Sequence, residues 1–297
     1  MGQRRFPTTY DARKLFFPGQ KISLKPLNDD TEVNFTICKL STPVTKSVVV
    51  LAKPDSGDPE QVVIKIYDPR YLDERFIESG CYKWNLATEQ TAAIERTKNP
   101  DLSDKELTHK MHSHRRKDLS GEDRATHDLS WEENFYRTMM EQYEAELTAY
   151  ERLKDLQGSA IPRLIMAGQF LPSDERAIRP PALVLEYIPS VNLYDVPCDA
   201  ITPAIREQVL SAIESFPLYG VLHNDINLTN IHLTPPEKPV KGFLLDFGSA
   251  RIRQESDREK TWTMCGACDV ELATYLLEDK YTDRDSPFYA QCVSRFK

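Results

Sequence analysis

The chain has 297 residues, of which 38 are basic and 46 acidic, so its formal net charge at pH 7 is −8. Its 40% hydrophobic and 28% charged residues exclude a fibrous or disordered chain, and its length allows one large domain or two lobes. The acidic balance argues against nucleic-acid binding and against an anionic membrane surface. No apolar run approaches the ~20 residues that span a bilayer. Residues 1–6 lack a signal-peptide core, so we expect an intracellular protein, cytoplasmic or nuclear.

Short apolar runs predict β-strands along most of the chain. In chain order, these strands are residues 33–40, 47–52, 61–67, 163–170, 182–188, 221–222, 231–233 and 243–245. The apolar pattern dissolves over residues 81–130. We interpret this stretch as an insertion outside the core, largely loop or disorder, with one short helix at 86–96.

Capping signals and periodicity predict three longer helices, over residues 131–156, 203–216 and 269–278. Ser130 and Glu133 form the capping box of the first helix. Its buried stripe recurs at alternating spacings of four and three residues, at Met139, Tyr143, Glu146, Tyr150 and Leu153. Glu146 is the exception in this stripe, because burial of a carboxylate requires a cationic partner.

Two groups of residues have spacings that occur in metal or redox sites. Cys265 and Cys268 form a C-x-x-C pair, but a zinc site needs further ligands and no second pair follows. Incidental reduced thiols are the favoured interpretation, and a redox pair is the alternative. The histidines of residues 109–117 lie among basic side chains, which favours a solvated basic patch over a metal site or a localisation signal.

The residues that point to chemistry follow the last short strands. Residues 223–230 read His-Asn-Asp-Ile-Asn-Leu-Thr-Asn, and residues 246–248 read Asp-Phe-Gly. Phosphoryl transfer needs a carboxylate that orients the attacking hydroxyl, and an amide and a carboxylate that hold magnesium. Asp225, Asn230 and Asp246 supply these groups at suitable spacing. The alternative is that all three are turn residues, favoured there for their short polar side chains.

Phosphoryl transfer also needs a cation on the non-transferred phosphates, and this cation is often positioned by a glutamate on a helix. Lys65 and Glu146 supply such a pair in the expected order along the chain. The alternatives are a solvated strand lysine and an exposed helix glutamate, since Glu144 and Glu151 compete for the same role.

These motifs, taken together, resemble those of the protein-kinase superfamily. Residues 62–65 look like V-A-I-K, residues 223–230 look like H-R-D-x-x-x-x-N, and residues 246–248 are D-F-G. The resemblance covers roughly residues 30–250. The sequence is also similar to uncharacterised kinase-like proteins of fungi, and its reduced C-lobe is closer to the RIO, aminoglycoside and choline kinases.

The resemblance implies a bilobal α+β fold, with an antiparallel N-lobe sheet of about five strands over residues 1–188 and a reduced helical C-lobe over residues 189–297. It implies ATP and Mg²⁺ as cofactors and a hydroxyl acceptor on a protein Ser/Thr or on a small molecule. Residues 184–188 resemble the hinge strand whose backbone binds adenine, which assigns Glu186 and Ile188 to the nucleotide. The implied catalytic or binding residues are Asp225, Asn230, Asp246, Lys65 and Glu146.

The departures from the family pattern favour a second hypothesis, a pseudokinase that acts as a binding scaffold. No glycine occurs between Gly19 and Gly57, so residues 40–45 replace the usual glycine-rich phosphate loop. Asn224 replaces the arginine that reads a phosphorylated activation loop, and no A-P-E motif follows residue 248. We therefore predict that any activity is independent of phosphorylation at Ser249, Ser256, Thr261 and Thr263.

Overall fold

The computed structural model describes residues 14–42, 44, 46–76 and 82–278. The chain folds as two compact units. The first unit comprises residues 1–143 and 165–185, and the second comprises residues 144–164 and 186–297. The bilobal arrangement and the domain division after residue 188 stay predictions. Among the described residues, no helix is both long enough and apolar enough to cross a lipid bilayer.

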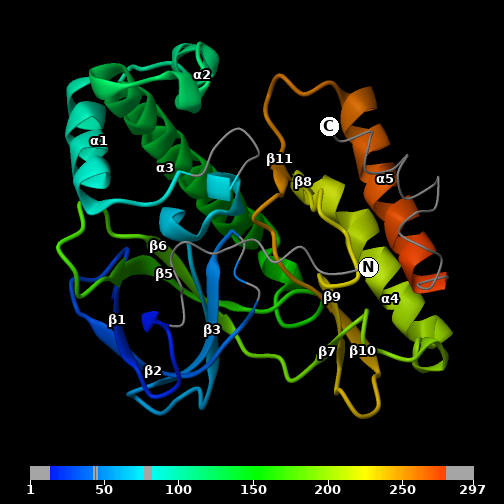
Figure 1. Cartoon of the computed structure of the whole chain (residues 1–297). Coiled ribbons are helices and arrows are strands. Elements are labelled where there is room, and N and C mark those ends of the chain that lie inside the picture. The colour runs from blue at the N-terminus through cyan, green and yellow to red at the C-terminus, as the bar shows by residue number, and fades with distance from the viewer. Residues whose placement is uncertain (1–13, 43, 45, 77–81, 279–297) are drawn as a thin grey trace. The chain divides into compact units, whose positions relative to one another are not determined.

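Six strands of the first unit close into a barrel in the order β1-β2-β3-β4-β6-β5 (Figure 1). They are β1 (Lys21–Pro26), β2 (Val33–Leu40), β3 (Val48–Pro54), β4 (Val62–Ile66), β5 (Leu164–Leu171) and β6 (Pro181–Glu186). The strands β2 to β6 confirm the sequence predictions. β1 adds a strand to the predicted five and closes the sheet, because it pairs with both β2 and β5. Its two alternating buried residues, Ile22 and Leu24, are too weak a pattern to predict a strand.

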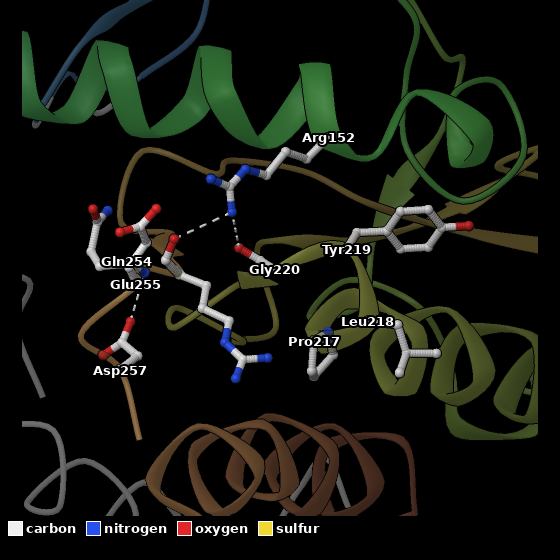
Figure 2. A pocket seen from close by; sticks show the side chains of 9 residues that line it. Arg152, Pro217, Leu218, Tyr219, Gly220, Gln254, Glu255 and Asp257 are labelled. Atoms are coloured by element: carbon white, nitrogen blue, oxygen red, sulfur yellow. Dashed lines mark hydrogen bonds between the residues drawn. The ribbon is translucent and has the colours of Figure 1, made fainter. Parts of the chain in front are cut away.

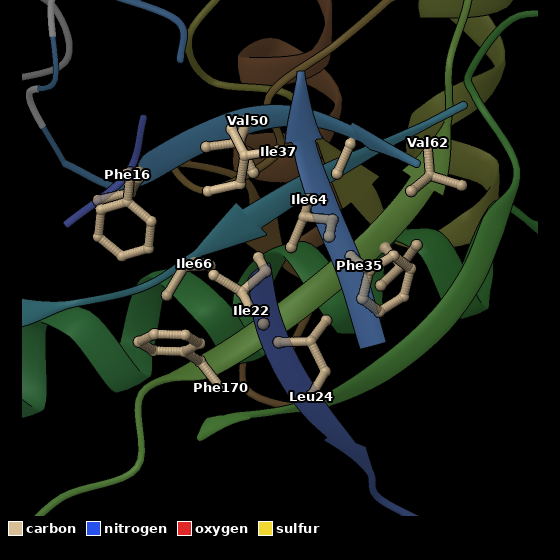
Figure 3. Close-up of a cluster of buried hydrophobic side chains, with 14 of the residues drawn as sticks. Phe16, Ile22, Leu24, Phe35, Ile37, Val50, Val62, Ile64, Ile66 and Phe170 are labelled. Atoms are coloured by element: carbon tan, nitrogen blue, oxygen red, sulfur yellow. The ribbon is translucent and has the colours of Figure 1, made fainter. Parts of the chain in front are cut away.

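Aliphatic and aromatic side chains fill the interior of this barrel (Figure 3). Leu24, Ile37, Val50 and Ile64 come from four different strands, and each is at most 1% exposed. Burial of such a side chain stabilises the fold by about 1.5–3 kcal/mol. Because successive side chains on a strand point to opposite faces, Lys65 points away from the face that Ile64 occupies.

The stretch interpreted as an unstructured insertion is largely helical, so that prediction is wrong. It contains α1 (Leu86–Lys98), which confirms the predicted short helix, and α2 (Asp104–His112). Leu107 and Met111 of α2 are buried in a second core together with Tyr82, Trp131 and Phe135. Two apolar residues one turn apart are enough to dock α2, but they are too few to produce a visible hydrophobic pattern.

The long helix α3 (Gly121–Arg152) begins well before the predicted start. Ser130 therefore lies inside the helix, where its hydroxyl donates to the Thr126 carbonyl at 3.1 Å, and the predicted capping box is wrong. Such back-bonding one turn earlier satisfies a serine hydroxyl within a helix. The predicted stripe is confirmed, since all five of its side chains are buried, including Met139 and Glu146.

The second unit contains α4 (Pro203–Ser215) and α5 (Glu259–Glu278), which pack side by side (Figure 1). Its strands are β7 (Val191–Asn192), β8 (Val221–Leu222), β9 (Ile231–Thr234), β10 (Lys241–Leu244) and β11 (Arg251–Ile252). β10, β9 and β7 form one sheet, and β11 pairs with β8. α4 is confirmed, with Thr202 as its cap, whereas α5 begins earlier than predicted. The sequence also predicts a polar tail after residue 278, and this tail lies outside the described residues.

Candidate functional site

The loop over residues 223–230 connects β8 to β9, and the buried side chain of its first residue, His223, fixes its backbone. His223 Nε2 lies 3.0 Å from the Leu245 carbonyl oxygen, and its Nδ1 accepts the Asp225 backbone N–H at 3.3 Å. Because a carbonyl oxygen can only accept, the ring is the neutral tautomer with its hydrogen on Nε2. The ring thereby fixes the backbone of Asp225 to the end of β10.

A carboxylate on α5 holds the start of the same loop. Asp269 Oδ2 accepts the backbone N–H groups of His223 at 2.9 Å and Asn224 at 3.2 Å. Burial raises the pKa of Asp269 above its ordinary value, against the opposing effect of these hydrogen bonds. Sequence reasoning missed this residue, because Asp269 is one acidic side chain among many and lies far along the chain from its partners.

Asn224 adopts a left-handed backbone conformation, with φ of 59°, which asparagine tolerates better than most residues. Its side-chain amide donates to the Ser249 carbonyl at 3.1 Å. Asn224 thus joins the 223–230 loop to the segment that follows Asp-Phe-Gly.

The carboxylate and carbonyl of Asp225 are surrounded by amide donors. Asn230 Nδ2 donates to the Asp225 carbonyl at 2.9 Å and to its Oδ2 at 3.3 Å. Asn227 Nδ2 approaches the same carbonyl at 3.1 Å and Oδ1 at 3.3 Å. With its nitrogen turned toward Asp225, Asn230 keeps an amide oxygen that accepts no hydrogen bond from the described part of the chain. Carboxylate and amide oxygens are the hard ligands that magnesium prefers.

Phe247 is buried, whereas the neighbouring Asp246 is exposed. Phe247 is fully buried among aromatic rings, with centroid distances of 4.7 Å to His223 and 5.7 Å to Tyr150. Asp246 is exposed and has a φ of 65°, in the left-handed region. Such a residue stores of order 1–3 kcal/mol of backbone strain. The Leu245 N–H donates to the Asn230 carbonyl at 2.9 Å, so the Asp246 backbone begins beside the end of the loop.

Glu146 is placed near this cluster by α3. Its side chain is 0% exposed, and Tyr150 lies one turn further along the helix. Burial raises the pKa of the Tyr150 hydroxyl well above 10, and the negative charges of Glu146 and Asp246 raise it further. Glu146 and Asp246, two carboxylates of the predicted site, therefore lie within electrostatic reach of one buried hydroxyl.

Lys65 belongs to the first unit. Its side chain is buried on β4, and Nζ lies 5.4 Å from the centroid of the Tyr67 ring. Glu146 belongs to the second unit, so the predicted pairing of Lys65 with Glu146 stays a prediction. The predicted phosphate loop also belongs to the first unit, and two of its residues, 43 and 45, lie outside the described residues.

The predicted hinge residues have different partners. Glu186 is engaged with Arg163, whose Nη1 donates to Oε1 at 2.7 Å and whose backbone N–H donates to Oε2 at 3.1 Å. The Ile188 carbonyl lies 3.0 Å from Ser190 Oγ, and the Ile188 N–H has no partner in the part of the chain that the structure describes. At Glu186 the side chain is occupied, whereas the Ile188 backbone offers a donor to a ligand.

The other motifs singled out in the sequence contribute no metal cluster. Cys265 and Cys268 lie on α5 and are not joined by a disulfide. No group of three or more histidine, cysteine or acidic side chains arranged to hold a metal occurs among the described residues.

A surface cavity of about 440 Å³ in the second unit is lined by none of the predicted site residues (Figure 2). It is lined by Arg152, residues 217–220, residues 253–255 and Asp257. Arg152 Nη1 donates to the Gly220 carbonyl at 2.9 Å and to the Arg253 carbonyl at 3.5 Å. Arg152 therefore ties the segment before β8 to the segment after β11, at the opposite ends of these two strands from His223 and Gly248.

No family model and no curated protein matches the chain. Among solved structures, 824 chains match. One is a double mutant of the PknI kinase domain from Mycobacterium tuberculosis, which is 16% identical to this chain with a TM-score of 0.40. The match covers 82% of this chain and 74% of the PknI chain.

Proposed function

We propose that the chain is an ATP- and magnesium-dependent phosphotransferase of the kinase type, which transfers a phosphoryl group to a hydroxyl. The observation that carries this proposal is the pairing of the Asp225 carboxylate with the Asn230 amide, on a backbone fixed by His223 and Asp269. Rigid placement of such groups is the main catalytic device of phosphoryl transfer.

Each residue of the site has one role in this proposal. Asp225 orients the acceptor hydroxyl and takes its proton. The oxygens of Asn230 and Asp246 hold magnesium, which neutralises charge on the phosphates when it is bound. Lys65 and Glu146 anchor the non-transferred phosphates, and the backbone at Glu186 and Ile188 binds the base of the nucleotide.

The acceptor class follows from resemblance alone. We favour a protein serine or threonine over a small metabolite, by analogy with the kinases that the motifs resemble. Phosphate transfer from labelled ATP to a cell lysate and to a metabolite pool separates these two classes.

The direct test is Asp225→Asn, which keeps the size of the side chain, removes the base and leaves one oxygen to accept from Asn227 or Asn230. We expect turnover to fall by about 10²–10⁴-fold, the usual contribution of general base catalysis, with nucleotide affinity unchanged. Asp246→Asn should instead weaken the magnesium-dependent part of nucleotide binding. Glu237→Gln is the control, because Glu237 is exposed in the turn between β9 and β10. Unchanged turnover in both site variants would contradict the assigned roles.

The pseudokinase scaffold is the second candidate, and the glycine-free segment between β2 and β3 favours it. Melting curves with ATP, with and without magnesium, distinguish the two. A nucleotide-binding protein is stabilised by about 2.7 kcal/mol at a hundredfold excess of ligand over its dissociation constant. No shift at millimolar ATP favours the scaffold.

A further inference from the structure

Strand β9 presents two polar side chains on the face opposite to its core. Ile231 and Leu233 are fully buried, whereas His232 and Thr234 alternate with them and are half-buried. His232 immediately follows the 223–230 loop and the first strand residue, so it can contact the loop itself.

Both of these side chains bond to the segment over residues 188–190, which follows the predicted hinge. His232 Nδ1 lies 3.0 Å from Ser190 Oγ, and the Thr234 hydroxyl donates to the Pro189 carbonyl at 2.7 Å. The segment 188–190 is therefore fastened to β9 at two positions.

The other ring nitrogen of His232 bonds to the 223–230 loop. Nε2 lies 3.1 Å from the Thr229 carbonyl oxygen. This carbonyl belongs to the peptide group that joins Thr229 to Asn230. The bond therefore fixes the orientation of the peptide group next to the Asn230 Cα. One imidazole thus links the segment 188–190 to the peptide of a proposed magnesium ligand.

The partners of the His232 ring determine where its hydrogen lies. The Thr229 carbonyl can only accept, so Nε2 carries the hydrogen, and Nδ1 of the neutral ring accepts from Ser190. The Ser190 hydroxyl has one hydrogen, which it shares between His232 Nδ1 and the Ile188 carbonyl, each 3.0 Å away. The N–H of Ile188 has no partner among the described residues and is left for a ligand.

We propose that His232 is a positioning residue that couples nucleotide binding at segment 188–190 to the placement of Asn230. This inference rests on the proposed function. It assigns the two ring nitrogens different tasks: Nδ1 acts on nucleotide binding through Ser190, and Nε2 acts on turnover through Thr229.

Two substitutions separate the two nitrogens. In His232→Gln the longer amide keeps a donor for Thr229 and loses the contact to Ser190, whereas His232→Asn keeps the contact to Ser190 and loses Thr229. We expect His232→Gln to raise the KM for ATP about three- to tenfold with kcat within about twofold, as loss of one hydrogen bond predicts. We expect His232→Asn to lower kcat by a similar factor with KM unchanged. His232→Leu should show both effects.

Variants of Ser190 test the nucleotide half alone. Ser190→Ala should reproduce the KM effect of His232→Gln, and Ser190→Thr, which keeps the hydroxyl, should restore the wild-type value. His109→Gln is the matched control, because His109 is an exposed histidine on α2. If the His232 variants lower the melting temperature without this split of KM against kcat, the role is only structural and the proposal fails.

A wild-type chain without turnover or nucleotide binding would refute the proposed function, and the coupling is then read by NMR. Long-range ¹H–¹⁵N spectra should show His232 with its hydrogen on Nε2. The chemical shift of the Asn230 backbone amide should change in His232→Asn and should stay unchanged in His232→Gln. The opposite tautomer, or equal shifts in both variants, overturns the proposal.

Discussion

Each unit of the molecule buries a carboxylate within a hydrogen-bonded cluster, but the two carboxylates have different kinds of partner. In the first unit, Asp68 accepts from Arg70 at 2.7 Å and from Arg176 at 2.8 Å, and Arg176 also donates to Glu89 at 2.6 Å. In the second unit, the buried carboxylate of Asp269 accepts backbone N–H groups.

The direction of the pKa differs accordingly. At Asp68, burial is the largest effect and raises the pKa, but the guanidinium groups of Arg176 and Arg70 together outweigh it and hold the pKa below its ordinary value. At Asp269, burial prevails and the pKa is raised. The first cluster therefore favours the ionised form of Asp68. In the second cluster, burial disfavours the ionised form of Asp269.

This difference separates a structural cluster from a positioning one. The first cluster joins the end of β4, the helix α1 and the segment between β5 and β6, and Trp84 adds a hydrogen bond to Glu89 at 2.7 Å. It stabilises the attachment of α1 to the barrel. The second cluster fixes two consecutive N–H groups of the 223–230 loop at a cost in stability, which is typical of residues that hold a functional geometry.

The largest effect is expected from breaking the first cluster. Asp68→Asn leaves two buried guanidinium groups without their shared carboxylate, and we expect a loss of about 3–5 kcal/mol in the free energy of unfolding. Urea unfolding measures this loss. The matched control is Asp174→Asn, which removes a carboxylate that is 37% exposed and bonds Arg70 at 3.1 Å. Its loss should stay below ~1 kcal/mol, and equal losses in the two variants would show that burial does not set the cost.

The sequence predicts the parts of the fold that follow from local patterns. Strands β2 to β6 and the helix α4 are predicted because apolar periodicity and a Thr-Pro start are local signals. The spacing of Asp225, Asn230 and Asp246 likewise points to one site from short segments alone.

The remaining features depend on contacts between distant residues. The helix α2 packs through a few apolar residues within a polar stretch, and the partners of Asp68 lie up to residue 176. The start of α3 was predicted too late because Ser130 and Glu133 mimic a cap inside a continuous helix. Asp269 gives no sequence signal, because its partners are backbone groups and no side-chain pattern records them.

A smaller effect, with a defined pH dependence, is expected from neutralising the second cluster. Because the folded-state pKa of Asp269 is raised, the wild type loses stability as the pH rises from about 3.8 through that raised pKa. Asp269→Asn removes this titration. The variant should match the wild type at pH 4 and gain stability relative to it toward pH 8, by about 1.4 kcal/mol for each unit by which the pKa is raised. Urea unfolding across this range measures the gain.

The same substitution should reduce turnover, because an amide oxygen holds the N–H groups of His223 and Asn224 less strongly than a carboxylate does. A variant that becomes more stable and less active supports a positioning role. A variant that loses stability at every pH would place Asp269 with the structural cluster of the first unit.

The smallest effect is expected from removing the candidate phosphorylation sites of the second unit. Thr261 and Thr263 lie on α5, and Ser256 lies in the short turn that Asp257 closes by accepting the Gln254 N–H at 2.8 Å. The 223–230 loop meets the segment after Asp-Phe-Gly through the neutral amide of Asn224, which cannot replace the charge of a phosphate-binding arginine. Replacing all three residues by alanine should therefore leave the initial rate within tenfold, about 1.4 kcal/mol in barrier, before and after phosphatase treatment. A larger change in rate under either condition would contradict this prediction, because it would show that activity depends on phosphorylation at these residues.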